Sequence, residues 1–293
     1  MSDGKASLLD YLKSWPLALL PHQLLSRLVR SISRCRARPV KDLLIRAFMW
    51  KFAIDLGEAV VTRASEFPDF NSFFTRALKP GIRPLPDEPG AIACPVDGYV
   101  SQAGQINHDS ILQAKGQEYS LKRLLGGDAG RAAPFLGGGF ATLYLSPSDY
   151  HRIHMPASGR LVETVYVPGR LYSVAPHTTR TIPGLFARNE RLVCLFDTNT
   201  GPMAVVMVGA IFVSCMETVW GGIANPHMWR SIQSQRHDQS SGQPLELARG
   251  AEMGRFNMGS TVIVLFGPGQ VCWTDTLRAG TPVRVGQLLG MPA

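Results

Sequence analysis

Residues 203–216 read MAVVMVGAIFVSCM and form the longest apolar run of the chain. The run includes Gly209 and Ser214. It is too short to cross a bilayer as a helix, which requires about 20 consecutive apolar residues. We therefore interpret this run as a buried β-strand.

Shorter runs of the same kind recur between glycines and prolines from about Gly90 onward. The 29 glycines and 21 prolines favour many turns and short strands over a helical bundle. The expected strands cover Gly98–Gly104, Phe140–Leu145, Gly159–Val167, Val193–Asp197, Ala204–Val213 and Thr261–Phe266. The polar stretch Ser231–Gln243 is expected to be an exposed loop. The pattern predicts an α+β fold whose larger part is a β-rich domain of short, mostly antiparallel strands.

The first 65 residues differ from the rest, because their apolar residues recur at helical spacing. One helical face collects Leu24, Leu25, Leu28, Val29 and Ile32, and the opposite face collects Arg27, Arg30 and Arg34. An earlier stripe consists of Leu8, Leu12, Trp15 and Leu19, and a third apolar segment runs from Lys41 to Val61. Two interpretations remain open: a helical cap packed on the protein's own core, or a basic amphipathic surface on anionic lipid.

The positive charge is concentrated in the same region. The chain has 293 residues and a formal net charge of +8, and residues 1–51 contain ten Lys or Arg against three Asp. Such a surface requires an anionic partner, either nucleic acid or an acidic membrane. The basic residues alternate with Leu and Trp on helices rather than surrounding base-stacking aromatics, which argues against nucleic acid.

The cysteines and the start of the chain indicate the compartment. Five widely spaced cysteines without a CxxC pair argue against a disulfide framework or a structural zinc, and for a reducing compartment. A secretory signal is not expected, because Pro16 and Pro21 interrupt the early apolar stretch. Asp3 and Asp10 weaken the alternative of an organellar transit peptide.

Two short motifs contain side chains suited to catalysis. Asp97 lies directly before a glycine in Pro95–Gly98, where a turn aspartate is the ordinary interpretation. His151 and His154 lie three residues apart in Tyr150–Pro156. The two histidines lack a further Cys or His at ligand spacing, so we expect no metal.

A third motif, Gly254–Thr261, leads into the apolar strand Val262–Phe266 and contains the only Gly-Ser step of the chain, Gly259-Ser260. Taken alone, it is better interpreted as a glycine turn that enters a strand.

Together these motifs resemble the pyruvoyl-dependent phosphatidylserine decarboxylases of the bacterial and mitochondrial type. The resemblance extends from about residue 66 to the C-terminus, in the order and spacing of that family. The matching blocks are Asn71–Arg76, Pro95–Gly98, Gln113–Gly116, Tyr150–Pro156, Phe186–Arg191, Phe196–Thr198 and Met258–Thr261. One departure is Met258, where the family usually has Leu; the similar volume and apolarity leave processing expected.

The resemblance implies a catalytic domain over residues 66–293 that cleaves itself between Gly259 and Ser260. The Ser260 hydroxyl attacks the Gly259 carbonyl, and the resulting ester is eliminated and hydrolysed to a pyruvoyl group on the new N-terminus. This cofactor forms a Schiff base with phosphatidylserine and accepts the electrons released with CO2, which yields phosphatidylethanolamine. The products of cleavage are a large chain, residues 1–259, and a small chain of 34 residues (293 − 259). A homodimer is also implied.

The resemblance also assigns roles to three further residues. His154 is the base that activates Ser260, and Asp97 orients His154, as in a serine-protease triad. His151 binds the headgroup carboxylate or donates the proton that replaces CO2. Residues 1–65 then form a basic amphipathic docking region of a peripheral enzyme on the cytoplasmic face of the cell membrane.

Two other classes of protein remain possible from the residues alone. A serine hydrolase would use Ser260, His154 and Asp97 without self-cleavage, but the chain lacks the Gly-x-Ser-x-Gly elbow. A non-catalytic lipid-binding β-domain would need the helices but none of the histidines. Only the decarboxylase predicts a separate small chain with a blocked, carbonyl-bearing N-terminus.

Overall fold

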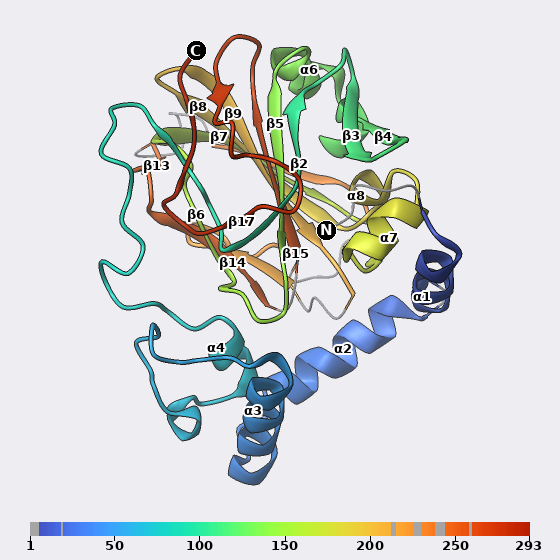
Figure 1. Cartoon of the computed structure of the whole chain (residues 1–293), viewed down its shortest axis with the longest axis vertical. Coiled ribbons are helices and arrows are strands. Elements are labelled where there is room, and N and C mark those ends of the chain that lie inside the picture. The colour runs from blue at the N-terminus through green and yellow to red at the C-terminus, as the bar shows by residue number, and fades with distance from the viewer. Residues whose placement is uncertain (1–5, 19, 212–214, 226–229, 238–243, 258–259) are drawn as a thin grey trace.

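The computed structural model describes residues 6–18, 20–211, 215–225, 230–237, 244–257 and 260–293 (Figure 1). Its helices are α1 (Leu8–Ala18), α2 (His22–Ser33), α3 (Arg38–Phe52), α4 (Phe70–Phe74), α5 (Leu121–Leu124), α6 (Ala129–Ala132), α7 (Pro176–Thr181) and α8 (Leu185–Arg188), with 3-10 turns at Ala64–Glu66 and Ala133–Phe135. Its first nine strands are β1 (Ile92–Ala93), β2 (Gly98–Gln105), β3 (Ser110–Ala114), β4 (Gln117–Ser120), β5 (Gly139–Leu145), β6 (Arg152–His154), β7 (Gly159–Val167), β8 (Arg191–Thr198) and β9 (Gly201–Gly209). The others are β10 (Cys215–Thr218), β11 (Gly222–Ile223), β12 (Gln233–Arg236), β13 (Glu246–Leu247), β14 (Glu252–Asn257), β15 (Ser260–Phe266), β16 (Cys272–Trp273), β17 (Pro282–Val283) and β18 (Leu288–Met291). The α+β class predicted from the sequence is confirmed.

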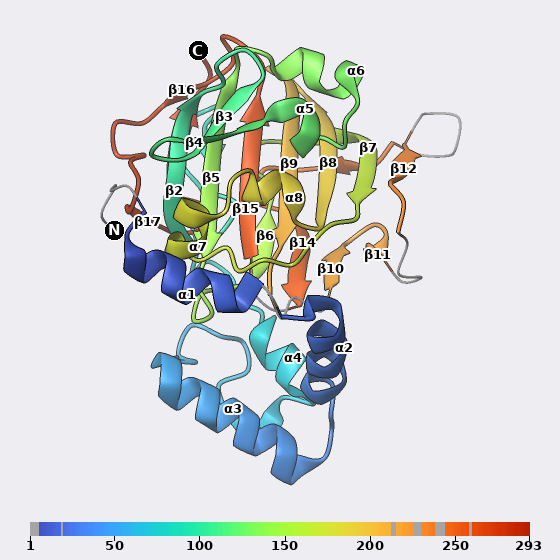
Figure 2. The same ribbon diagram turned by 90° about the vertical axis from the view of Figure 1, so that its right-hand side faces the viewer.

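A nine-stranded antiparallel sheet forms the centre of the molecule. Its strand order is β12-β7-β8-β9-β15-β5-β2-β17, with β13 paired to β7. The apolar run that starts at Met203 supplies β9, which lies between β8 and β15 (Figure 2). The strand predicted for this run ends at Gly209 in the structure, and the end predicted for it, Val213, lies outside the described residues.

Both faces of this sheet are covered, which explains why its central strands are continuously apolar. In β15, Val262 and Val264 belong to the core on one face, and Ile263 belongs to the core on the other. The first core is closed by residues of a four-stranded sheet, β11-β10-β14-β6. The second is closed in part by residues of the short helices α5 and α8, which lie across the sheet in Figure 2.

The N-terminal helices lie below and beside the sheets (Figure 1). Helix α3 packs on α4 through a separate third core that includes Ile45, Phe70 and Phe73. Helix α1 packs against α7, and Arg180 of α7 forms an ion pair of 2.8 Å with Asp10 of α1. Among the described residues, no helix is long and apolar enough to cross a membrane.

Helices α1 and α2 bury polar side chains and expose apolar ones. The buried polar residues are Asp10, Ser14, His22, Ser26 and Ser33. Six of the exposed apolar residues are called here the apolar stripe: Leu8, Leu12, Trp15, Leu24, Leu28 and Ile32. Their exposed fractions run from 42% to 77%. A cap packed on the protein's own core by its apolar face would show the opposite arrangement, so that interpretation fits α3 but not α1 or α2.

The predicted loop Ser231–Gln243 is wrong in one part. Residues Gln233–Arg236 form β12, which pairs with residues Glu163–Tyr166 of β7. The backbone of β7 would otherwise be an open sheet edge, and a short polar strand at such an edge stays in contact with water. Polarity alone therefore did not distinguish this edge strand from a loop.

Candidate active site

Ser260 is the first residue of β15, directly after the chain crosses between the two sheets. Strand β14 belongs to the four-stranded sheet and ends at Asn257, and β15 belongs to the nine-stranded sheet. Ser260 is in register with Leu145 of β5 and Gly209 of β9. Met258 and Gly259, and with them the predicted scissile bond, lie outside the described residues. The predicted nucleophile thus lies where two residues join strands of different sheets.

His154, at the end of β6, is held by both ring nitrogens. Its Nδ1 lies 2.7 Å from the carbonyl oxygen of Gly250, and its Nε2 lies 3.0 Å from the hydroxyl of Tyr150. A carbonyl only accepts, so Nδ1 carries the proton and Nε2 accepts from Tyr150. Burial lowers the pKa of His154 below the usual histidine value. The ring is therefore neutral at pH 7, with Nε2 as its basic atom.

His151, the residue directly before β6, is fully buried. Its Nδ1 lies 2.8 Å from the carbonyl oxygen of Asp149, and its ring lies 4.0 Å, centroid to centroid, from that of Phe74. Burial lowers the pKa of His151 to about 3, so its Nε2 is an acceptor. Among the described residues this nitrogen has no hydrogen-bond partner. A buried acceptor without a partner is costly, so a donor placed beside this nitrogen would stabilise the site.

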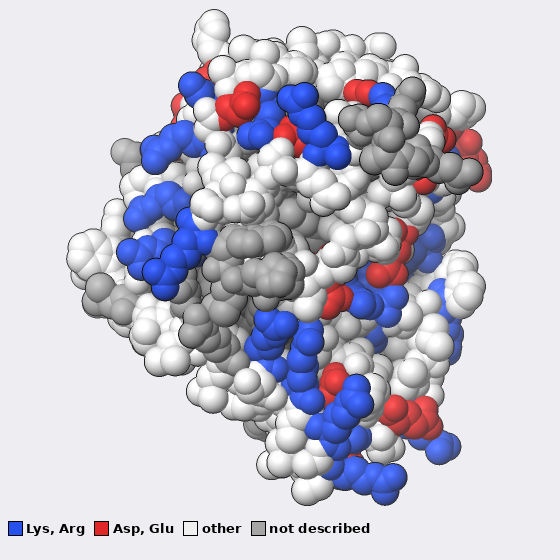
Figure 3. Space-filling model, turned by 180° about the vertical axis from the view of Figure 1, so that it is seen from behind, with Lys and Arg blue, Asp and Glu red and all other residues white. Residues whose placement is uncertain are grey.

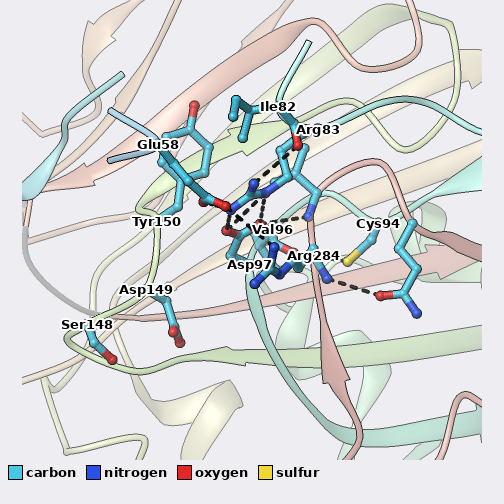
Figure 4. A network of polar contacts seen from close by, with 12 residues as sticks. Glu58, Ile82, Arg83, Cys94, Val96, Asp97, Ser148, Asp149, Tyr150 and Arg284 are labelled. Carbon is cyan, nitrogen blue, oxygen red and sulfur yellow. Dashed lines mark hydrogen bonds and ion pairs between the residues drawn. The ribbon is translucent and has the colours of Figure 1, made fainter. Parts of the chain in front are cut away.

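Asp97 precedes β2 and is bound by Arg83 (Figure 4). Its Oδ2 lies 2.6 Å from Nη2 of Arg83, and its Oδ1 accepts from the backbone N–H of Val285 at 2.8 Å. Arg83 also contacts Glu58 at 2.7 Å. The hydrogen bond to Asp97 raises the pKa of Arg83 above its usual value, so the guanidinium stays protonated.

The structure brings Asp97 and His154 into one neighbourhood without a direct hydrogen bond between their described side chains. The backbone N–H of His154 donates to the carbonyl of Pro95 at 2.9 Å. The nearby charge of Asp97 acts to raise the pKa of His154, although burial outweighs it. Asp97 thus influences His154 through its charge. The hydrogen bond that was expected to orient the His154 ring is made by the carbonyl of Gly250 and not by Asp97.

A cleft of about 320 Å³ opens beside Asp97. Among its lining residues are Arg76, Asp149 and Tyr150. Burial raises the pKa of Asp149 and lowers that of Arg76. No role was predicted for these side chains, although Arg76 and Tyr150 belong to the matching blocks. Their presence in those blocks was the only available signal.

Side chains in and directly after helix α4 form hydrogen bonds to two parts of the site. Asn71 donates from Nδ2 to Oδ1 of Asn257, the last residue of β14, at 2.9 Å. Arg76 donates from Nη2 to the carbonyl of Ser148 at 3.1 Å. The block Asn71–Arg76 therefore connects residue 257 with the loop that carries His151.

Comparison with known sequences identifies the family. The sequence profile described as phosphatidylserine decarboxylase matches residues 70–291, and a second profile described as PSD matches residues 12–53. The chain belongs to the phosphatidylserine decarboxylase family, which confirms the resemblance and the prediction of a decarboxylase.

Curated relatives support this assignment over nearly the whole chain. The phosphatidylserine decarboxylase proenzyme of Ectopseudomonas mendocina is 58% identical over 272 residues, 93% of this chain and 95% of the relative. The proenzymes of Pseudomonas putida and Pseudomonas aeruginosa are each 57% identical over 274 residues, 94% of this chain and 95% and 94% of theirs.

Proposed function

We propose that this protein decarboxylates phosphatidylserine to phosphatidylethanolamine and CO2 in phospholipid biosynthesis, after cleaving itself between Gly259 and Ser260. The observation that supports this best is the position of Ser260, at the start of a central strand and separated by two residues from the end of β14 in another sheet. The proenzyme names of the relatives are consistent with cleavage.

Self-cleavage needs a base for the Ser260 hydroxyl, because serine is a weak nucleophile at its normal pKa. His154 suits this task since it is neutral and its Nε2 accepts a proton. Protonation would make the ring cationic, and the carboxylate of Asp97 favours that charge. Asp97 therefore acts on His154 through its negative charge, and the carbonyl of Gly250 keeps the proton of the neutral ring on Nδ1.

The residues near position 260 also suit a pyruvoyl group there. When present, this group supplies a sink for the electron pair left by a departing carboxyl group. The buried Nε2 of His151 is an acceptor without a partner among the described residues. We infer that this nitrogen first accepts a hydrogen bond from the substrate. It then takes up that proton and delivers it to the carbon that has lost CO2. A neutral His151 does not bind the headgroup carboxylate as a cation.

The apolar stripe supports attachment to a membrane surface. Six large apolar side chains are exposed on two successive helices, more than isolated surface residues would explain. On the face seen in Figure 3, Lys and Arg side chains gather over the lower end of the molecule, where α2 and α3 lie. We infer that residues 1–65 dock the enzyme on anionic lipid at the cytoplasmic face of the cell membrane, as a peripheral protein. A homodimer is also proposed, on the family resemblance alone.

Intact-mass analysis of the purified protein tests the central proposal. Two chains are expected, residues 1–259 and a small chain that begins at a ketone instead of Ser260. Ser260→Ala should remain one chain without decarboxylase activity. An uncleaved wild-type protein that still releases CO2 from the lipid would refute the pyruvoyl mechanism.

The role of His151 is tested separately. His151→Ala should still be cleaved and should decarboxylate roughly 10²–10⁴-fold more slowly, the range typical of a lost acid or base. Product analysis of the cleaved variant on phosphatidylserine measures this. Full activity would remove His151 from the mechanism.

A further inference from the structure

Glu190 is the one charged residue of the block Phe186–Arg191 whose side chain the fold does not explain. Asn189 donates from Nδ2 to the backbone carbonyl oxygens of Tyr172 and Gly209. Arg191 donates to the carbonyl oxygens of Leu124 and Arg123 at 2.6 Å each. These two side chains hold loops in place, so the carboxyl group of Glu190 needs a separate account.

Glu190 lies beside Ser260 on the sheet. The backbone N–H of Gly209 donates to the carbonyl of Glu190 at 2.8 Å, and Gly209 is the register partner of Ser260. Neighbouring strands lie about 4.8 Å apart, so the backbone of Glu190 is about 10 Å from that of Ser260. Gly209 places no side chain between the two positions.

The carboxyl group of Glu190 is held on the side of the sheet that carries the histidines. It forms a side-chain hydrogen bond with Tyr166, a member of the first core cluster, to which Ile153 of β6 also belongs. Asn225 in turn donates from Nδ2 to the Tyr166 hydroxyl at 2.6 Å. The chain from Asn225 through Tyr166 to Glu190 orients the carboxyl group as a base is oriented in other active sites.

The charge of Glu190 is not balanced by any ion pair within the described part of the chain. Among the described residues, Tyr166 is the titratable group that faces it; Arg188 binds the Tyr172 hydroxyl, and Arg170 is exposed. Burial raises the pKa of Glu190 to about 7. A largely buried carboxyl group poised between its two protonation states beside a reacting position is typical of catalysis.

We propose that Glu190 binds the primary ammonium group of the substrate headgroup and removes one proton from it. In this step an N–H bond breaks and an O–H bond forms on the Glu190 carboxyl group, which leaves a neutral amine. An ammonium nitrogen has no lone pair, so this transfer must precede its attack on a carbonyl carbon. The inference rests on the proposed function, because it places that carbonyl at residue 260. It also selects for primary ammonium over quaternary ammonium headgroups, which have no proton to give.

Two amine probes test the step in the cleaved enzyme. Methoxyamine is already neutral at pH 7 and needs no base, whereas short-chain phosphatidylserine carries an ammonium group. Glu190→Gln should cleave itself and form the methoxyamine adduct of the small chain at the wild-type rate. Its borohydride-trapped adduct with phosphatidylserine should form roughly 10²–10⁴-fold more slowly. Glu246→Gln, which changes an exposed glutamate on β13, is the matched control.

The outcomes separate the two proposals. A wild-type rate of phosphatidylserine adduct in Glu190→Gln refutes the role of Glu190. Absence of any methoxyamine adduct in the wild-type small chain refutes the proposed function itself.

Tyr166→Phe gives a readout that a purely structural glutamate would not change. The hydrogen bond from Tyr166 lowers the pKa of Glu190, so its loss should raise that pKa further. The rising limb of the rate of adduct formation should move to higher pH. In uncleaved Ser260→Ala, an infrared carboxyl band should titrate near pH 7 and be missing once Glu190→Gln is added. An unmoved limb or an absent band contradicts the assignment.

Discussion

The N-terminal helices and the nine-stranded sheet place their apolar side chains in opposite ways. In β15, Val262, Ile263 and Val264 are fully buried between two covered faces. On α1 and α2 the apolar stripe is exposed, while Asp10 and Ser14 are buried against the protein. Apolar side chains therefore stabilise the fold in one region and stay exposed to solvent in the other, where we propose that they contact a membrane.

Catalysis and membrane attachment are the two functions proposed for these regions, and substitutions should be able to remove each one independently. The sheets carry Ser260, His154 and His151, and the first helices carry the apolar stripe. We expect substitutions in the sheets to abolish catalysis without affecting membrane attachment. We expect substitutions in the apolar stripe to weaken attachment without affecting catalysis.

The largest effect is expected from His154→Ala. The Ser260 hydroxyl loses its base, so the chain should stay uncleaved on a denaturing gel and lack activity. Sedimentation with anionic vesicles should remain at the wild-type level, because α1 and α2 are unchanged. Normal cleavage of this variant would assign the base to another residue.

The reverse effect is expected from Leu8→Ser, Leu12→Ser and Trp15→Ser combined. Burial of a large apolar side chain contributes about 1.5–3 kcal/mol, so three losses should weaken vesicle binding by 10²-fold or more. Self-cleavage, measured on the same gel, should proceed as in the wild type. Unchanged vesicle binding would return α1 to the role of a structural cap.

A matched pair of aromatic truncations compares the two regions in stability. Phe266→Ala removes a ring with 0% exposure at the end of β15 and should reduce the free energy of unfolding by about 3–5 kcal/mol. Trp50→Ala removes a ring with 87% exposure on α3 and should change it by less than about 0.5 kcal/mol. Denaturant unfolding of both variants measures the contrast, and equal losses would contradict the buried-versus-exposed distinction.

The smallest effect concerns the contact that positions α1. The hydrogen bond from Arg180 lowers the pKa of Asp10 well below its usual range. A lowered carboxyl pKa stabilises the folded state above the unfolded value of about 3.9, and this contribution is lost progressively as pH falls from that value through the lower folded pKa. Acidification from about pH 4 towards pH 2 should therefore loosen α1, seen as faster cleavage by an acid protease within residues 8–18. Asp10→Asn should be loosened already at pH 7, with less further change on acidification.

Much of the sheet was predictable because its strands are short and apolar between turn residues. The strand predicted at Gly159–Val167 has the same bounds in the structure, and that predicted at Thr261–Phe266 differs by one residue. The edge strand at Gln233–Arg236 was not predictable, since it is polar and depends on the open edge of β7.

The sequence by itself determined the α+β class, the family and the identity of the candidate residues, because these depend on local patterns and on ordered motifs. Only the tertiary structure decided which side of each N-terminal helix faces outward, since periodicity defines a stripe but not its neighbour. It also decided the partners of each polar group: Asp97 binds Arg83, His154 binds Gly250 and Tyr150, and Glu190 lies across Gly209 from Ser260. Such partners come from strands far apart in the chain, and their pairing follows from sheet register, which no single segment encodes.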